Sequence, residues 1–272
     1  MMTIQESDTS FTGSLPTIYD TYLVPLIFEP YAADLAPRLA ARAPARVLEI
    51  AAGTGVVTRA LASALPESVS IVATDLNQAM LDQAAVRGTG RSVEWRQADA
   101  MSLPFEDETF EAVVCQFGVM FFPDKSKAFS EARRVLRPGG VFIFSVWDRI
   151  EENEFANGVT VALETMFPED PPRFMVRTPH GYFDSSLIER DLAAGGFASA
   201  GIETVSARSR AESARIPAVA FCQGTPLRNE IEKRNGSLTA ATEVAERAVA
   251  GRFGSQNIEG RTQALVVTLE RP

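Results

Sequence analysis

The residues of this chain that could do chemistry begin with a glycine turn in "VLEIAAGTGVVT", residues 47–58. Gly53 and Gly55 carry no side chain, so a ligand could lie directly against the backbone there. Asp75 follows 22 positions after Gly53, at the end of the next apolar run. A carboxylate at that place can accept hydrogen bonds from both hydroxyls of a ribose. The spacing therefore indicates a ligand that contains a nucleoside.

Two residues beside the turn distinguish between the two cofactors we weigh, a dinucleotide and S-adenosylmethionine. A dinucleotide-binding turn needs a third glycine so that helix and strand pack closely, and Thr58 stands at that position. The carboxylate of Glu49 would repel a pyrophosphate, but it suits a sulfonium or an ammonium group. S-adenosylmethionine carries both cations, so the turn favours methyl transfer. An NAD-dependent oxidoreductase is the disfavoured alternative.

The elements that must position these residues alternate between Arg46 and Trp147. Strands are expected at 46–51, 68–75, 92–99, 110–119 and 141–147, and helices at 56–65, 77–87 and 124–136. Asn77 is a candidate N-cap of the second helix. Repeated strand–helix units of this length give a parallel sheet with right-handed crossovers and helices on both faces.

The flanking segments have a different pattern. Residues 15–43 look helical but broken at Pro25, Pro30 and Pro37, and residues 217–252 look mostly helical. A helix is expected at 185–197, and strands at 201–209 and 262–270. The whole chain, 1–272, therefore predicts one domain with insertions. Its core is about 45–147 plus 185–209 and 262–270, and its cap material is 10–43, 149–182 and 210–255.

Composition narrows the classes of function. The chain has 272 residues, 46% of them hydrophobic, with a formal net charge of −9 and a sequence pI of about 4.9. This acidity disfavours nucleic acid and anionic membranes as partners. Two separated cysteines and a single histidine, His180, predict neither a disulfide framework nor a zinc site. No secretion signal or stretch of ~20 apolar residues occurs, so we expect a soluble cytoplasmic protein.

Four segments in order resemble motifs of the class I S-adenosylmethionine-dependent methyltransferases. They are "VLEIAAGTGVVT", "ATDLN", "QADAMSLPFEDETFEAVVCQF" and "EARRVLRPGG". The branch they resemble is the small-molecule group that includes the ubiquinone/menaquinone-biosynthesis methyltransferases. The resemblance implies a Rossmann-like α/β fold, with a seven-stranded, mixed, mostly parallel sheet and a helical cap. One departure is Ala51, which replaces the first glycine of the usual family turn.

The resemblance also implies roles for individual residues. At the methionine end of S-adenosylmethionine it places Glu49, Ala51, Gly53 and Gly55, and at the ribose Asp75. The adenine would meet Leu76, Asp99 and Ala100, and the methionine ammonium would meet the backbone carbonyl of Gln116. Tyr19 would close over the cofactor.

The acceptor is expected to be a small apolar or aromatic molecule, because "VMFFPD" (119–124) and "FPEDPPRFMV" (167–176) supply apolar surface. His180 is a weak candidate for a general base, since its ordinary pKa lies near neutrality. A non-catalytic S-adenosylmethionine-binding protein is a further alternative. Nucleic-acid methylation is opposed by the charge and by "QFGVM", which stands where a base-flipping motif would follow the fourth strand.

Overall fold

A computed structural model describes residues 6–9, 11 and 13–272. Most of the "MMTIQESDTS" segment and residues 10 and 12 of the expected cap material lie outside the described residues. The chain divides into two compact units. The sheet unit comprises Tyr31–Val146, Tyr182–Val205 and Ala264–Pro272, and the helical unit comprises Met1–Pro30, Trp147–Gly181 and Ser206–Gln263. The expectation of a single domain with a cap stays a prediction.

Seven strands form one sheet in the order β3-β2-β1-β4-β5-β7-β6. Their bounds are β1 Arg46–Ile50, β2 Ser70–Asp75, β3 Glu94–Gln97, β4 Phe110–Gln116, β5 Leu136–Trp147, β6 Gly201–Ser213 and β7 Gln256–Glu270. The first five strands pair in parallel. Strand β7 runs antiparallel to β5, because the amide of Gly139 bonds to Arg271 while the amide of Asp148 bonds to Gln263. The mixed, mostly parallel sheet is therefore confirmed.

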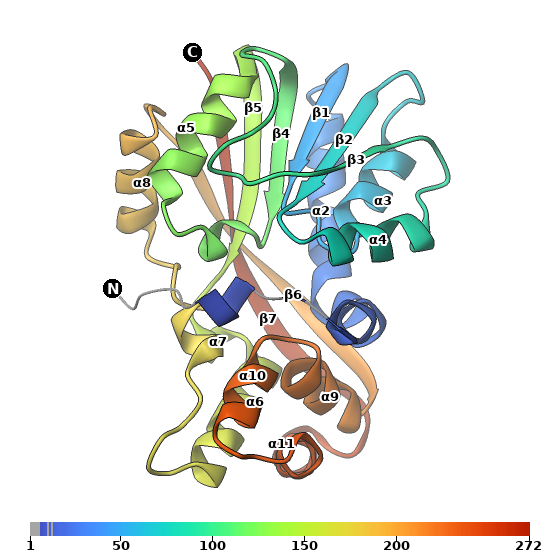
Figure 1. The fold of residues 1–272 in the computed structure, drawn as a ribbon, viewed down its shortest axis with the longest axis vertical. Coiled ribbons are helices and arrows are strands. Elements are labelled where there is room, and N and C mark those ends of the chain that lie inside the picture. Colours follow the sequence, from blue (N-terminus) through green and yellow to red (C-terminus); the bar gives the residue numbers. More distant parts are fainter. Residues whose placement is uncertain (1–5, 10, 12) are drawn as a thin grey trace. The chain divides into compact units, whose positions relative to one another are not determined.

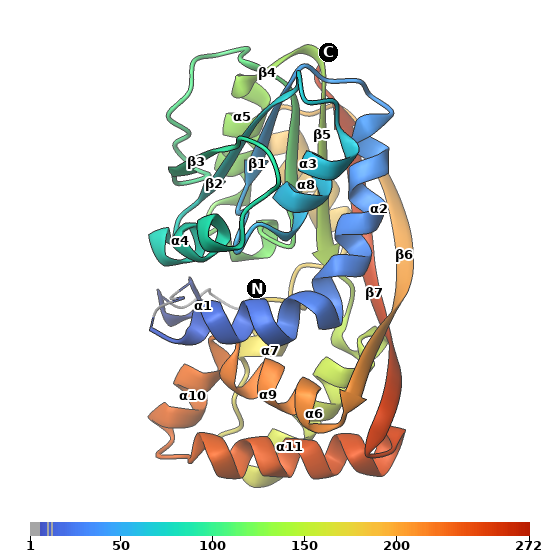
Figure 2. The same cartoon turned by 90° about the vertical axis from the view of Figure 1, so that its right-hand side faces the viewer.

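Helices cover both faces of the sheet, as expected from the strand–helix alternation (Figure 1). One face carries α2, α3 and α4, and the other carries α5 and α8. Figure 2 shows α2 lying along β6, where Arg38 bonds to Glu203. These helices are α2 Glu29–Ala40, α3 Val56–Ala64, α4 Gln78–Arg87, α5 Lys125–Val135 and α8 Ser185–Ala194. Asn77 is the N-cap residue of α4 as predicted, although its side chain makes no capping hydrogen bond.

The core of the sheet unit explains why most side chains of β1 and β4 are buried. Both strands are central in the sheet, so their side chains are buried on both faces. On the α2–α3 face Val47, Val114 and Ile143 pack against Leu61 of α3. On the other face Phe129 of α5 packs on β5. Burial of this kind contributes about 1.5–3 kcal/mol for each large side chain and fixes the strand ends that carry the polar residues.

Helices dominate the helical unit (Figure 2). Helices α6, α9 and α11 pack against one another. The elements are η1 Glu6–Thr9, α1 Leu15–Ile18, η2 Tyr19–Phe28, η4 Ile150–Glu152, α6 Glu154–Met166, α7 Phe174–Arg177, α9 Arg215–Gln223, α10 Leu227–Lys233 and α11 Leu238–Phe253. A buried Arg177 joins α7 to two other elements, because its guanidinium pairs with Asp8 at 2.6 Å and with Glu230 at 2.7 Å.

The predicted helix breaks at three prolines are wrong. Helical structure runs without interruption from Leu15 to Ala40. Pro25 lies inside η2, which is a π-helix, and its wider hydrogen-bonding pattern tolerates a residue without an N–H. Pro30 is the second residue of α2, where the N–H is not needed, and only Pro37 lies deeper inside that helix.

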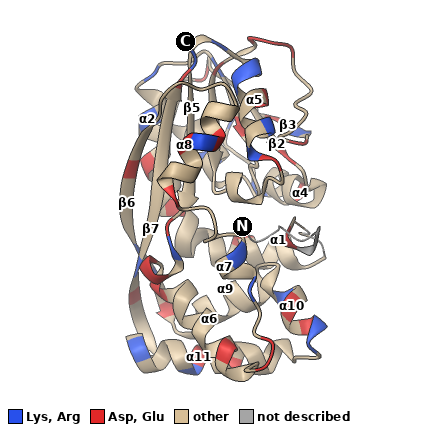
Figure 3. Cartoon of the chain, turned by 90° about the vertical axis from the view of Figure 1, so that its left-hand side faces the viewer, with Lys and Arg blue, Asp and Glu red and all other residues tan. Residues whose placement is uncertain are grey.

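Charged residues of both signs are interspersed over the described elements (Figure 3). Many form exposed ion pairs, such as Arg42 with Glu270 and Arg210 with Glu259. Such pairs contribute little to stability. Within the described part of the chain, no helix has the length and hydropathy needed to cross a membrane.

Candidate functional site

The turn between β1 and α3 is built from left-handed backbone. Ala51 has φ +56°, Gly53 φ +56° and Gly55 φ +82°. A side chain at 51 is uncommon in this region and costs about 1 kcal/mol. Gly55 is required by packing as well as by conformation, because a Cβ there would lie 2.9 Å from the ring of Trp95. The turn is therefore strained at Ala51. At Gly55 the absence of a side chain leaves room for the ring of Trp95.

Asp75 joins this turn to the end of β2. Its Oδ2 accepts a hydrogen bond from the Gly53 amide at 2.9 Å, and its Oδ1 accepts one from the Asn77 amide at 2.8 Å. Burial raises the pKa of Asp75, while these amide donors oppose the rise. Each carboxylate oxygen has a second lone pair. The group can thus hold the turn and still accept further hydrogen bonds from a ligand.

Glu49 and Thr58 form a buried pair beneath the turn. The hydroxyl of Thr58 donates to Oε2 of Glu49 at 2.6 Å, and Glu49 is 2% exposed. Burial raises the pKa of Glu49 to about 8, although the Thr58 hydrogen bond and Arg59 lower it. A cation bound nearby would favour the ionised form of this carboxyl group.

The loops that follow β2 and β3 present the residues expected around an adenine. Leu76 is 52% exposed beside Asp75, which is unusual for a large apolar side chain. Oδ1 of Asp99 accepts from the Met101 amide at 2.8 Å, and Ala100 is buried. Because β2 and β3 are parallel neighbours, these loops lie at the same edge of the sheet.

The end of β4 completes this edge. Gln116 is paired in register with Ser145 of β5, and β-strand alternation places both side chains on the same sheet face as Glu49. Phe117 adopts a left-handed φ of +55°. Gly118 follows, and a Cβ at that residue would lie 2.5 Å from the Cβ of Ala51. The loop after β4 is therefore in close contact with the first turn.

Two hydroxyl groups at this edge were missed by sequence reasoning. Among the residues that the structure describes, the buried Oγ1 of Thr54 and Oγ of Ser145 have no hydrogen-bond partner. Unsatisfied buried polar groups are rare, and their presence indicates a polar ligand or water. A serine inside the apolar run "VFIFSVW" was the available signal for Ser145.

Tyr19 belongs to the helical unit and lies in η2. Its ring stacks on Phe28 with centroids 5.1 Å apart and meets Phe11 edge-on at 6.0 Å. Its closure over a cofactor stays a prediction.

His180 also belongs to the helical unit, where it is 4% exposed. Its Nδ1 lies 2.8 Å from the carbonyl oxygen of Asp148, so this nitrogen carries the hydrogen and donates. Burial lowers the pKa of His180 to about 4, so the ring is neutral at neutral pH. A base this weak takes up a proton poorly at neutral pH. The catalytic role of His180 stays a prediction, and packing accounts for its contacts.

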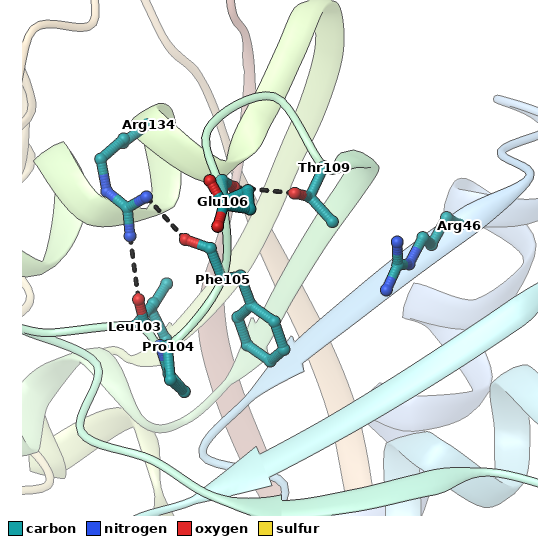
Figure 4. Close-up of a pocket in the computed structure, with 7 residues that line it drawn as sticks. All are labelled: Arg46, Leu103, Pro104, Phe105, Glu106, Thr109 and Arg134. Atoms are coloured by element: carbon teal, nitrogen blue, oxygen red, sulfur yellow. Dashed lines mark hydrogen bonds between the residues drawn. The ribbon is translucent and has the colours of Figure 1, made fainter.

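A hollow of about 550 Å³ lies at the opposite edge of the sheet (Figure 4). It reaches from Arg46, the first residue of β1, to the loop 103–109. The guanidinium of Arg134 bonds there to the carbonyls of Leu103 and Phe105 and to Glu131 and Asp107, so its donors are already used. Strand β1 separates this hollow from the turn after Ile50, and we assign it no part in the site.

Comparison with known proteins identifies the segment that carries this site. A protein-family model described as "Methyltransferase domain" matches residues 48–144. Those residues include the first turn, Asp75, Asp99 and the end of β4. This segment is similar to known methyltransferase domains. The resemblance to class I S-adenosylmethionine-dependent methyltransferases is confirmed for this segment.

Two curated methyltransferases are similar to part of this chain. The ubiquinone/menaquinone biosynthesis C-methyltransferase of Hahella chejuensis is 42% identical over 103 residues, which cover 36% of this chain and 41% of that protein. The demethylmenaquinone methyltransferase of Deinococcus radiodurans is 39% identical over 102 residues, covering 37% and 42%. The chain thus spans less than half the length of these relatives.

Solved structures share the fold over most of the chain. The YcgJ protein of Bacillus subtilis has a TM-score of 0.56 at 21% identity, covering 89% of this chain and 99% of that one. The Haemonchus contortus phosphoethanolamine N-methyltransferase 2, solved with phosphomonomethylethanolamine and S-adenosylhomocysteine, has a TM-score of 0.59 at 17% identity, covering 95% and 57%. At these identities the likeness concerns the fold alone.

Proposed function

We propose that this chain transfers the methyl group of S-adenosylmethionine to a small-molecule acceptor. The observation that carries the proposal is the carboxylate of Asp75, which bridges the amides of Gly53 and Asn77 within a methyltransferase domain. A buried carboxyl group, Glu49, lies beneath the same turn. This arrangement suits a ligand that has a ribose at one end and cationic groups at the other.

The residues of the carboxyl edge fit S-adenosylmethionine. The orphaned hydroxyl of Thr54 offers a further hydrogen bond to the polar methionine end, and the exposed Leu76 offers apolar surface to the adenine. The proposed ligand contacts follow the order of the strands: Glu49, Ala51, Gly53 and Gly55, then Asp75 and Leu76, then Asp99 and Ala100, then Gln116, with Tyr19 from the helical unit.

The main catalytic task of the protein in methyl transfer is to position the methyl donor and the acceptor. The bound cofactor supplies a methyl group on a sulfonium, which is already a good leaving group. The residues of this chain orient the donor, exclude water and place the acceptor in line, and such positioning can lower the barrier by about 7–11 kcal/mol. Glu49 contributes a negative charge beside the donor when it is ionised, and Thr58 fixes the orientation of that carboxylate.

An apolar or aromatic acceptor is favoured by the loop after β4. Phe121 and Phe122 are partly exposed aromatic residues in the segment that follows that strand. Such surface suits an uncharged ring better than a polyanion. The relatives named for quinone biosynthesis are consistent with this class of acceptor, and the net charge of −9 disfavours nucleic acid.

Two measurements test the proposal. Isothermal titration with S-adenosylmethionine and with NAD distinguishes methyl transfer from the oxidoreductase alternative, and we expect binding of the first alone. Release of S-adenosylhomocysteine is then followed with quinol precursors, phenols and small amines. Cofactor binding without release for any acceptor would support the non-catalytic alternative. Binding of NAD in place of S-adenosylmethionine would overturn the proposal.

A further inference from the structure

Lys125 is a buried amine at the first position of α5, next to the loop that follows β4. The residue is 9% exposed, which is rare for lysine. Its Nζ donates to the carbonyl oxygen of Phe122 at 2.9 Å and lies 3.4 Å from that of Met120. Burial lowers the pKa of Lys125 to about 8, while Asp191 and Asp124 oppose this change. The side chain is therefore drawn into the protein to bind the loop carbonyls.

The segment before α8 also contacts the lysine, through Tyr182. Nζ lies 4.8 Å from the centroid of the Tyr182 ring, in the geometry of a cation–π contact. The hydroxyl of Tyr182 donates to Oδ2 of Asp191 in α8 at 3.1 Å, and Arg190 bonds to the other oxygen of that carboxylate. The charged groups that face the ammonium are thus Asp124 on its own helix and Asp191 on α8.

The carbonyls that Lys125 binds belong to the short helix η3 Val119–Phe121 and the residue after it. This segment follows Gly118, whose Cα approaches Ala51 so closely that a Cβ would lie 2.5 Å from the alanine methyl group. Contacts therefore run from α8 through Lys125 to η3, and from Gly118 to the turn that holds Asp75. A shift of η3 would therefore change the packing of Gly118 against Ala51.

We propose that Lys125 is a positioning residue, which fixes the loop 117–122 against the first turn and so holds the donor-binding edge in its binding conformation. The proposal rests on the proposed function, because the affinity it affects is that for S-adenosylmethionine or its product. Lys125 acts through the loop and needs no contact with either ligand.

A matched pair of variants tests this role. Lys125→Met keeps most of the apolar stem but removes the donors and the charge. Lys127→Met makes the same change two residues away, where the side chain is 52% exposed and lies 3.6 Å from Glu131. Titration with S-adenosylhomocysteine should give about tenfold weaker binding for Lys125→Met and less than twofold change for Lys127→Met, in the range known for residues that touch neither ligand. Equal affinities in Lys125→Met and wild type would overturn the proposal.

Hydrogen exchange of the ligand-free protein separates this proposal from the proposed function. Lys125→Met should increase exchange in residues 117–122 and 51–54 and leave the β2 amides at 71–74 unchanged. A uniform increase over the whole sheet unit would mean general destabilisation and would overturn the positioning role. If wild type binds neither S-adenosylmethionine nor its product while the local exchange pattern is seen, the proposed function fails and the loop contact stands. Lys125→Arg, which keeps donors and charge, should recover part of the protection.

Discussion

Thr58 donates its hydroxyl hydrogen to Glu49 across 2.6 Å, inside a site where the carboxyl group is 2% exposed. In the sequence each residue argued separately against a dinucleotide cofactor. Thr58 replaces the third glycine of the dinucleotide-binding turn, and the Glu49 carboxylate would repel a pyrophosphate. In the structure they are a single unit. Thr58, which replaces the glycine, donates the hydrogen bond that orients the Glu49 carboxyl group.

The first prediction concerns the pH dependence of cofactor binding. Because burial raises the pKa of Glu49 to about 8, the free protein is mostly protonated there at pH 6–7. A cationic ligand favours the ionised form, so affinity for S-adenosylmethionine should rise by up to about tenfold per pH unit below pH 8 and level off above it. Titration calorimetry in two buffers of different ionisation enthalpy should detect proton release below pH 8. In Glu49→Gln both the rise and the proton release should vanish, whereas a flat wild-type profile from pH 6 to 8 would contradict the prediction.

The second prediction concerns Asp75. Asp75→Asn retains one carbonyl acceptor for the amides of Gly53 and Asn77 but loses the charge. Hydrogen bonds to charged groups contribute about 1.5–3 kcal/mol, so cofactor affinity should fall roughly 10- to 100-fold. Asp82→Asn on the exposed surface of α4 is the control, and its affinity should match wild type. Affinity equal to wild type in Asp75→Asn would remove the ribose contact from the proposed site.

The third prediction concerns Gly118. In Gly118→Ala the new methyl group would overlap Ala51, at 2.5 Å, and the Sγ of Cys115, at 2.7 Å. Overpacking of this kind costs about 1–3 kcal/mol, and it should also weaken cofactor binding. Gly158→Ala in α6 meets no atom within 4 Å and should raise stability by about 0.5–1 kcal/mol, as expected for a helical glycine. Urea unfolding of both variants measures the two effects, and equal shifts would argue against close packing at 118.

The fourth prediction concerns His180. Its pKa in the folded state, about 4, lies below the ordinary value of 6.5 because of burial. The folded protein therefore resists protonation, and the stability that this group contributes is present above pH 6.5 and lost as the pH falls toward 4. The free energy of unfolding should fall by about 3 kcal/mol through this group. Unfolding by urea at pH 7.5 and pH 4.5 should show a shallower decline in His180→Gln than in wild type. Parallel declines would show that His180 titrates normally.

The sequence predicted all seven strands, and for β2 and β4 the signal was the nearly continuous apolar run of a buried parallel strand. The strand ends differ from the expectation, and β3 is shorter than expected, at Glu94–Gln97. The helix around Pro25 was misjudged because a π-helical segment has no simple sequence signal. The packing of the Trp95 ring against Gly55, forty positions away, was not predicted, and the contact of the Gly55 backbone with a ligand stays a prediction. Lys125 and Ser145 were missed for the same reason: their roles depend on strand register and on contacts distant in the chain.

Ala51 and Gly118 share room for a single methyl group. Ala51 carries the methyl group and adopts a left-handed φ. Gly118 has no side chain and leaves the space for that methyl group. Exchange of the two side chains in the double variant Ala51→Gly/Gly118→Ala should recover part of the stability lost in Gly118→Ala alone. We therefore expect that substitutions at 51 and 118 occur together in related sequences.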